Sequence, residues 1–208
     1  VNIGLVNEFK TLCIKMGIDP FEVIEAAGTK PFGFSGFLPG PGLGGHCIPI
    51  DPFYLTWSAR KYNLKVQFIE LSGIINSSMP SYVVSRIIFS LNSIQKSVSG
   101  SKILICGIAY KKNIEDVRES PAGPIIDELR NLGANITLFD PVVHRYLKIY
   151  RDLPVLNEIP ANNATFFHDI SVILTHHNDF DLSSISEQSK IVVDTRGCLP
   201  VGKNVIRG

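Results

Sequence analysis

The alternation of β-rich and helical segments after residue 98 constrains the fold of this chain more than any other feature. The predicted strands are Lys102–Ile108, Asn135–Phe139, Ser171–Thr175 and Lys190–Asp194. A helix that Ser120-Pro121 opens and Gly133 closes, and a short helix at 182–188, lie between them. Because strands alternating with helices form parallel βαβ units, we expect an α/β fold with a Rossmann-like domain over residues 98–208.

Residues 1–97 carry no comparable strand pattern and are predicted to form an all-helical central domain. Apolar residues recur every three or four positions over 1–16 and 67–94. Asp19-Pro20 and Asp51-Pro52 each match the start of a shorter helix. The first stripe consists of Val1, Leu5, Phe9, Leu12, Cys13 and Met16. A helical region of this size cannot readily bury both stripes alone, so we expect a homodimer formed through them.

Charge and cysteine content exclude several classes of protein. The 20 Lys+Arg against 19 Asp+Glu, with no basic run, lack the footprint that nucleic acid or an anionic membrane requires. No apolar run approaches the roughly 20 residues of a membrane span. The four cysteines form no CxxC pair, which disfavours a zinc site or a disulfide framework and indicates a reducing cytoplasm.

The segment Thr29–Ile50 is rich in glycine and contains four prolines, a composition that no regular element tolerates. Long ordered loops inside compact domains usually have a function. Cys47 lies in this loop just before a predicted helix, where the helix dipole and nearby amides favour an anionic thiolate, so it is a candidate nucleophile. Asp51 is equally suited to capping that helix and to acting as a base. A direct pair with His46 is disfavoured because adjacent side chains usually point apart.

A second candidate site is Gly107–Pro121, which follows the first predicted strand. It lacks the G-x-G-x-x-G fingerprint, which disfavours a dinucleotide there. Lys111 and Lys112 with the helix start at Ser120 could hold a phosphate or a uracil ring, or form only a solvated basic turn. Arg196 follows another strand at the same sheet edge, where it and Lys111 could converge on one anion.

The remaining reactive residue types are interpreted as structural. Cys13 lies on an apolar helix face and Cys106 within a strand, so both are expected in the core. His176 and His177 follow a strand without a thiol or acidic cluster around them, and we expect both to be exposed to solvent.

Taken in order, these motifs resemble those of the UDP-glucose/GDP-mannose dehydrogenase family, most closely the branch that oxidises UDP-N-acetylhexosamines at C6. The resemblance spans nearly the whole chain. It rests on residues 1–8 (VNIGLVNE), 29–33 (TKPFG), 39–52 (PGPGLGGHCIPIDP), 107–111 (GIAYK), 118–121 (RESP) and 194–197 (DTRG). Ile50 stands where UDP-glucose-specific members have a lysine, which argues against glucose as the sugar.

The resemblance implies roles for particular residues. Cys47 would be the nucleophile and Asp51 would assist thioester hydrolysis, while Lys111 and Arg196 would contact the UDP part of the substrate. Backbone of residues 37–45 would lie along the sugar nucleotide. The substrate-binding residues implied in this loop are Phe37, Leu38, Pro39, Gly40, Gly44 and Gly45. The family oxidises a primary alcohol to a carboxylate with two hydride transfers to NAD, through a thiohemiacetal and a thioester on the cysteine.

The resemblance also implies an NAD-binding domain before Val1, so we expect a piece of a longer enzyme that is inactive by itself. The leading hypothesis is therefore a fragment of an NAD-dependent UDP-N-acetylglucosamine or UDP-N-acetylmannosamine 6-dehydrogenase of the cytoplasm. One alternative is a UDP-sugar-binding or dimerisation module that works alone. Another is a cysteine hydrolase or acyltransferase using Cys47, which the absence of an assignable His and acidic partner disfavours.

Overall fold

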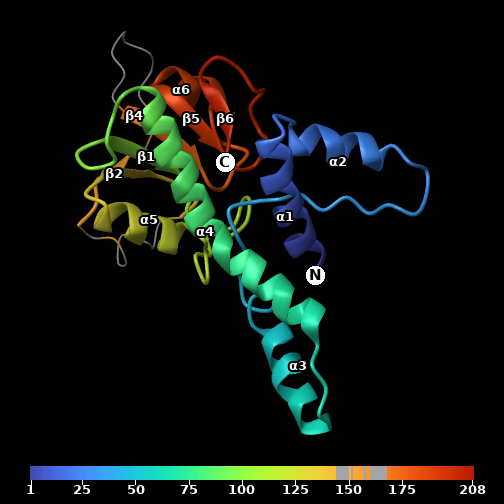
Figure 1. Cartoon of the computed structure of the whole chain (residues 1–208). Coiled ribbons are helices and arrows are strands. Elements are labelled where there is room, and N and C mark those ends of the chain that lie inside the picture. The colour runs from blue at the N-terminus through green and yellow to red at the C-terminus, as the bar shows by residue number, and fades with distance from the viewer. Residues whose placement is uncertain (144–149, 151, 157, 160–167) are drawn as a thin grey trace.

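The computed structural model describes residues 1–143, 150, 152–156, 158–159 and 168–208 (Figure 1). Its N-terminal part is helical, and its C-terminal part is a parallel sheet with helices on both faces. The helical part contains α1 (Asn2–Lys15), α2 (Pro20–Gly28), α3 (Asp51–Ala59), the 3-10 helix η1 (Arg60–Tyr62) and α4 (Gln67–Ser93). The second part contains β1 (Lys102–Cys106), α5 (Ala122–Asn131), β2 (Asn135–Phe139), β3 (Val155–Leu156), β4 (His168–Ile173), α6 (Leu182–Glu187), β5 (Ser189–Asp194) and β6 (Val205–Arg207).

The sheet has the strand order β3-β2-β1-β4-β5-β6, and all of its pairings are parallel. This is the order of a doubly wound sheet, with the reversal of direction between β1 and β4. The expected α/β class with a Rossmann-like parallel sheet is therefore confirmed. The edge strands β3 and β6 were not predicted, because two or three residues are too few to show a periodic pattern.

Two apolar clusters cover the two faces of the sheet. The larger one joins α5 and the second half of α4 to one face, and the smaller one joins α6 and Phe180 to the other. Val83, Ile87 and Leu91 of α4 are completely buried against the strands. Since α4 thus packs into the core of the α/β part, the domain boundary at residue 98 stays a prediction that these contacts do not decide. Cys13 and Cys106 are buried, as expected.

Four of the six residues in the apolar stripe of α1 lie on the opposite face from the one that the protein buries. Val1, Leu5, Leu12 and Met16 are each more than half exposed. The buried positions are Gly4, Asn7, Lys10 and Cys13, a line at three-residue spacing that contains two polar side chains. The expected homodimer stays a prediction, and within the chain the helix packs through its polar line.

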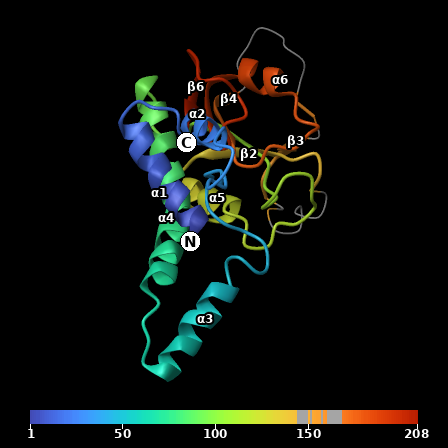
Figure 2. The same ribbon diagram turned by 90° about the vertical axis from the view of Figure 1, so that its right-hand side faces the viewer.

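Helix α3 and the first half of α4 project from the rest of the molecule as an arm (Figures 1 and 2). The apolar residues of this arm are mostly exposed, among them Phe53, Trp57, Phe68, Leu71 and Ile74. The stripe predicted for 67–94 is therefore buried only in its second half. None of the helices in the described ranges is long and apolar enough to cross a membrane.

Candidate functional site

Cys47 lies in a turn that leads directly into α3. Its carbonyl oxygen accepts hydrogen bonds from the amides of Ile50 and Asp51, at 3.1 and 2.8 Å, which starts the helix. The thiol is exposed, and its Sγ lies 3.8 Å from Nδ1 of His46. The side chains of these adjacent residues therefore do meet, contrary to the sequence-based expectation, although the contact is long.

Asp51 is the first residue of α3 and not its N-cap. The N-cap is Ile50, and no side-chain hydrogen bond caps the helix. The Asp51 side chain is exposed, one helical turn from Cys47. The sequence left open whether Asp51 caps this helix or acts as a base, and its carboxylate forms no capping hydrogen bond.

The middle of the glycine-rich loop is fixed at Gly40 by two buried polar residues of α1. Asn7 accepts a hydrogen bond from the Gly40 amide at 2.9 Å, and Lys10 donates to the Gly40 carbonyl at 3.0 Å. Both side chains are fully buried, and Asn7 also donates to Asn76 of α4 at 2.9 Å. Burial, reinforced by the charge of Arg196, lowers the pKa of Lys10 to about 7. The sequence did not predict these two buried polar residues, because hydrophobic periodicity indicates only the apolar face of a helix.

The end of the loop lies against the segment 110–119 of the α/β part. The Gly45 amide donates to the Arg118 carbonyl at 2.9 Å. A Cβ atom at Gly44 or Gly45 would lie within 3 Å of the Tyr110 side chain, and Gly45 has a φ of +93°. These glycines therefore allow a close approach that no other residue type permits. The predicted catalytic loop and the 107–121 segment, distant in sequence, form one unit.

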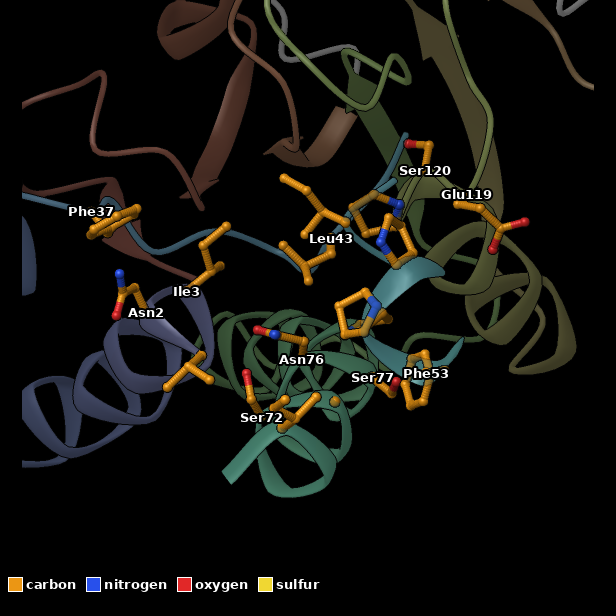
Figure 3. Close-up of a pocket in the computed structure, with 18 of the residues that line it drawn as sticks. Asn2, Ile3, Phe37, Leu43, Phe53, Ser72, Asn76, Ser77, Glu119 and Ser120 are labelled. Carbon is orange, nitrogen blue, oxygen red and sulfur yellow. The ribbon is translucent and has the colours of Figure 1, made fainter. Parts of the chain in front are cut away.

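A cavity of about 610 Å³ lies beside this unit, between α1, the loop, α4 and the segment before α5 (Figure 3). Its lining includes Ile48 and Pro49, the residues that follow Cys47. The lining residues labelled in Figure 3 are Asn2, Ile3, Phe37, Leu43, Phe53, Ser72, Asn76, Ser77, Glu119 and Ser120. Of the residues implied to bind substrate, Phe37 lines this cavity, and Leu38 is exposed next to it in the chain.

Lys111 and Arg196 both follow carboxyl ends of strands, β1 and β5, with β4 between them. This spacing separates the two strands by roughly 10 Å. Lys111 is exposed, whereas Arg196 is partly buried and donates through Nε to the Leu174 carbonyl at 2.6 Å. Its guanidinium lies against Gly40. Burial lowers the pKa of Arg196 to about 10, which leaves it cationic at neutral pH.

His177 is completely buried, so the expectation that it faces solvent is wrong. It forms a hydrogen bond from Nε2 to Asp140 at 3.2 Å, and its Nδ1 accepts from the Asn113 amide at 3.0 Å. His176 is only partly exposed. A polar pair of adjacent histidines after a strand gives no sign of which one turns inward, because the direction is set by the Asp140 that follows β2.

One buried ion-pair network connects the helical part to the sheet. Arg207 of β6 donates to Asp19 at 2.7 and 3.0 Å and to Asp194 at 2.8 Å. Asp19 is the N-cap of α2, as predicted, and also accepts from the Phe21 amide. The Arg207 guanidinium lies over the Phe21 ring, 5.3 Å from its centroid. This arginine was not singled out in the sequence.

Comparison with known proteins shows which family the chain belongs to. Residues 1–78 match the model of the UDP-glucose/GDP-mannose dehydrogenase family, central domain, and residues 104–201 match that of its UDP binding domain. The chain belongs to this family. The two matched regions cover the loop with Cys47 and the 107–121 segment that it contacts.

Individual members of the family resemble the chain over 96% to 100% of its length. UDP-N-acetyl-D-glucosamine 6-dehydrogenase of Pseudomonas aeruginosa is 36% identical over 100% of the chain and 49% of the relative. UDP-N-acetyl-D-mannosamine dehydrogenase of Methanococcus vannielii is 32% identical over 96% of the chain and 45% of the relative. The structure of UDP-D-ManNAc dehydrogenase from Pyrococcus horikoshii matches with a TM-score of 0.80 and 30% identity, over 100% of this chain and 48% of that one. The chain thus spans about half the length of these relatives.

Proposed function

We propose that this chain supplies the catalytic cysteine and the UDP-binding part of an NAD-dependent UDP-N-acetylhexosamine 6-dehydrogenase, which oxidises the C6 alcohol to a carboxylate. The observation that carries the proposal is the contact between the loop of Cys47 and the segment 110–119 of the UDP binding domain. A substrate held at that segment by its nucleotide would extend its sugar along the loop towards the thiol.

Cys47 is the covalent catalyst of this proposal. Its thiolate adds to the C6 aldehyde carbon, forming a C–S bond while the carbonyl oxygen takes up a proton. Loss of a hydride from C6 and of the hydroxyl proton converts this thiohemiacetal to a thioester. Water then adds to the thioester carbon and the C–S bond breaks, which releases the carboxylate and restores the thiolate. The exposed position of the thiol in the turn before α3 leaves room for the added carbon.

Asp51 is proposed to assist the hydrolysis. It is the first residue of α3, and its amide is bonded to the Cys47 carbonyl, so the two residues keep a fixed relation. The exposed carboxylate has no capping bond to compete for it. Its proposed role is to orient the attacking water and accept its proton.

The nucleotide end is assigned to Lys111 and Arg196. Both are cations at the carboxyl edge of the sheet, and the proposal places the diphosphate between the exposed lysine and the arginine under Gly40. The backbone of Phe37, Leu38, Pro39, Gly40, Gly44 and Gly45 is proposed to line the path from there to Cys47.

NAD is the expected oxidant, but the residues described do not fit it at the switch point of the sheet. The amides of Ile108 and Ala109 after β1 already donate to the buried Asp140 carboxylate, at 2.7 and 3.2 Å. A pyrophosphate needs these amides and a close glycine turn. We therefore assign the dinucleotide to a separate domain of the whole enzyme.

A homodimer is part of the proposal. The exposed apolar residues of α1, α3 and the first half of α4 favour a second copy of the chain as their partner.

Calorimetry on the 208-residue chain tests the assignment of ligands. UDP and a UDP-N-acetylhexosamine are expected to bind weakly, NAD not to bind, and no NADH to form. Lys111→Ala should abolish the binding, while Lys203→Ala, which precedes β6 at the other sheet edge, should not change it. A chain that binds NAD and not UDP would contradict the proposal. For the whole enzyme, NADH production with a panel of UDP-sugars identifies the sugar.

A further inference from the structure

The loop that carries Lys111 is attached to the sheet at both of its ends. At its start, the Asp140 carboxylate accepts from the amides of Ile108 and Ala109, and Thr175 Oγ1 donates to the Ala109 carbonyl at 2.6 Å. At its end, the Asn113 amide donates to Nδ1 of His177 at 3.0 Å. Only residues 110–112 lie between these anchors, so the hydrogen bonds at the two ends determine the position of Lys111.

The hydrogen bonds of His177 determine its tautomer. A backbone amide can only donate, so Nδ1 must carry a lone pair towards Asn113. The Asp140 carboxylate accepts, so Nε2 must carry the proton. Both side chains are fully buried, and the other Asp140 oxygen accepts from the amides of Val142 and Val143 at 3.0 Å each. The imidazole is thus held by one partner on each side and has no freedom to exchange roles.

The electrostatics of the Asp140–His177 pair favour an ionised Asp140 carboxylate. Burial opposes ionisation of Asp140, but hydrogen bonds from His177 and from the Ile108 amide outweigh it and hold the pKa of this carboxyl below its usual range. An anion of the chain itself therefore occupies the amides after β1. The loop is shaped by this internal anion instead of by a ligand phosphate, and the side chains of Lys111 and Lys112 are exposed.

The conformation and hydrogen bonds of Asn113 also fix the end of the loop. Its φ of 60° is in the left-handed region, which asparagine tolerates better than most residues. Its side-chain oxygen accepts from the Asn178 amide at 2.9 Å, next to His177 in the chain. The loop end is thus bonded twice to the segment that follows β4.

We infer that His177, fixed by Asp140 as the Nε2–H tautomer, is a positioning residue that sets the loop of Lys111 for binding the diphosphate of a uridine nucleotide. The inference rests on the proposed function, because it assigns a role in UDP binding. It acts through the Asn113 amide and involves no contact between His177 and the ligand.

Three substitutions separate the two hydrogen bonds of His177. His177→Asn keeps an acceptor for the Asn113 amide at the position of Nδ1 and loses the donor to Asp140. His177→Gln keeps a donor to Asp140 and loses the acceptor for the Asn113 amide. His177→Ala loses both hydrogen bonds. By calorimetry on the 208-residue chain, the Gln and Ala variants should raise the Kd of UDP about tenfold, which corresponds to ~1.4 kcal/mol. The Asn variant should stay within about threefold of the wild type, which a purely space-filling role would not predict.

Two controls isolate the positioning role. His176→Asn changes the neighbouring histidine, which is not bonded to the loop in the described contacts, and should leave the Kd unchanged. Leu129→Val thins the core under α5 and should lower the melting temperature without changing the Kd.

Hydrogen exchange of the Asn113 amide gives a readout independent of UDP. This amide should be protected in the wild type and in His177→Asn, and should exchange at least about tenfold faster in the Gln and Ala variants. Unchanged exchange, or an unchanged Kd in the Gln and Ala variants, would overturn the inference. A wild-type chain that binds no UDP would overturn the proposed function, and the exchange of Asn113 would still decide whether His177 holds the loop.

Discussion

Replacing Arg207 with methionine should destabilise the protein more than any change to a surface ion pair. The guanidinium is 9% exposed and donates to Asp19, to Asp194 and, at 2.7 Å, to the Leu199 carbonyl. Methionine keeps most of the volume and removes the charge. It leaves a carboxylate that is completely buried, at Asp194, and one that is 9% exposed, at Asp19, without their cation.

The expected cost follows from this burial. Removing one partner of a buried ion pair costs about 3–5 kcal/mol, because the remaining charge stays desolvated. For a chain of this length each kcal/mol lowers the melting temperature by roughly 2–4 °C, so a fall of about 6–20 °C is expected. Scanning calorimetry and urea unfolding measure the two quantities.

Arg130→Met is the matched control. Arg130 pairs with Asp152, but their side chains are 39% and 59% exposed. Exposed pairs of this kind contribute about 0–1 kcal/mol. If Arg207→Met costs no more than Arg130→Met, the network does not hold the helical part to the sheet and the reasoning from burial fails.

The pH dependence of the same variant has a defined sign. Burial opposes ionisation of Asp19, yet hydrogen bonds from Arg207 and the Phe21 amide outweigh it and lower its pKa. A lowered carboxyl pKa stabilises the fold above the ordinary value of the group and loses this effect as the pH falls. The difference between wild type and Arg207→Met should therefore shrink in acid, and a difference that grows would contradict this assignment.

Three further results are expected. In the whole enzyme, Cys47→Ser should fold and bind substrate, but its kcat should fall about 10⁴-fold while KM stays nearly unchanged. Asp51→Asn should lower kcat less and accumulate a thioester, which mass spectrometry detects on the peptide containing Cys47. A Cys47→Ser enzyme with the parental rate would show that this cysteine is structural. Because burial beside Arg196 lowers the pKa of Lys10 to about 7, the stability of the wild type should rise between pH 7 and 10, and Lys10→Met should remove this slope in urea unfolding. Light scattering should show a dimer at micromolar concentration that Leu5→Glu with Leu12→Glu dissociates, since both side chains are more than half exposed; a wild-type monomer would refute the interface.

Local signals determined much of the architecture. The runs of β-branched residues and the capping residues place the ends of the four longer strands and of α5 to within three residues, since these signals lie within a few positions of each other. Asp19 is a cap, as the Asp-Pro sequence predicts. The motifs around Cys47 and Lys111 were sufficient for the family, because short segments of specific residues in a fixed order leave few alternatives.

Only the tertiary structure decided which side chains from distant segments of the chain contact one another. Asn7 and Lys10 bind Gly40, Gly44 and Gly45 lie on Tyr110, and His177 turns inward to Asp140. Each of these contacts joins residues at least 30 positions apart in the chain. A sequence pattern reports the periodicity of one segment, whereas the burial of a polar side chain depends on a hydrogen-bonding partner supplied by another. Most of the apolar stripe of α1 is exposed and its polar line is buried for that reason, because the partners of Asn7 and Lys10 lie on α4, in the glycine-rich loop and at Gly208.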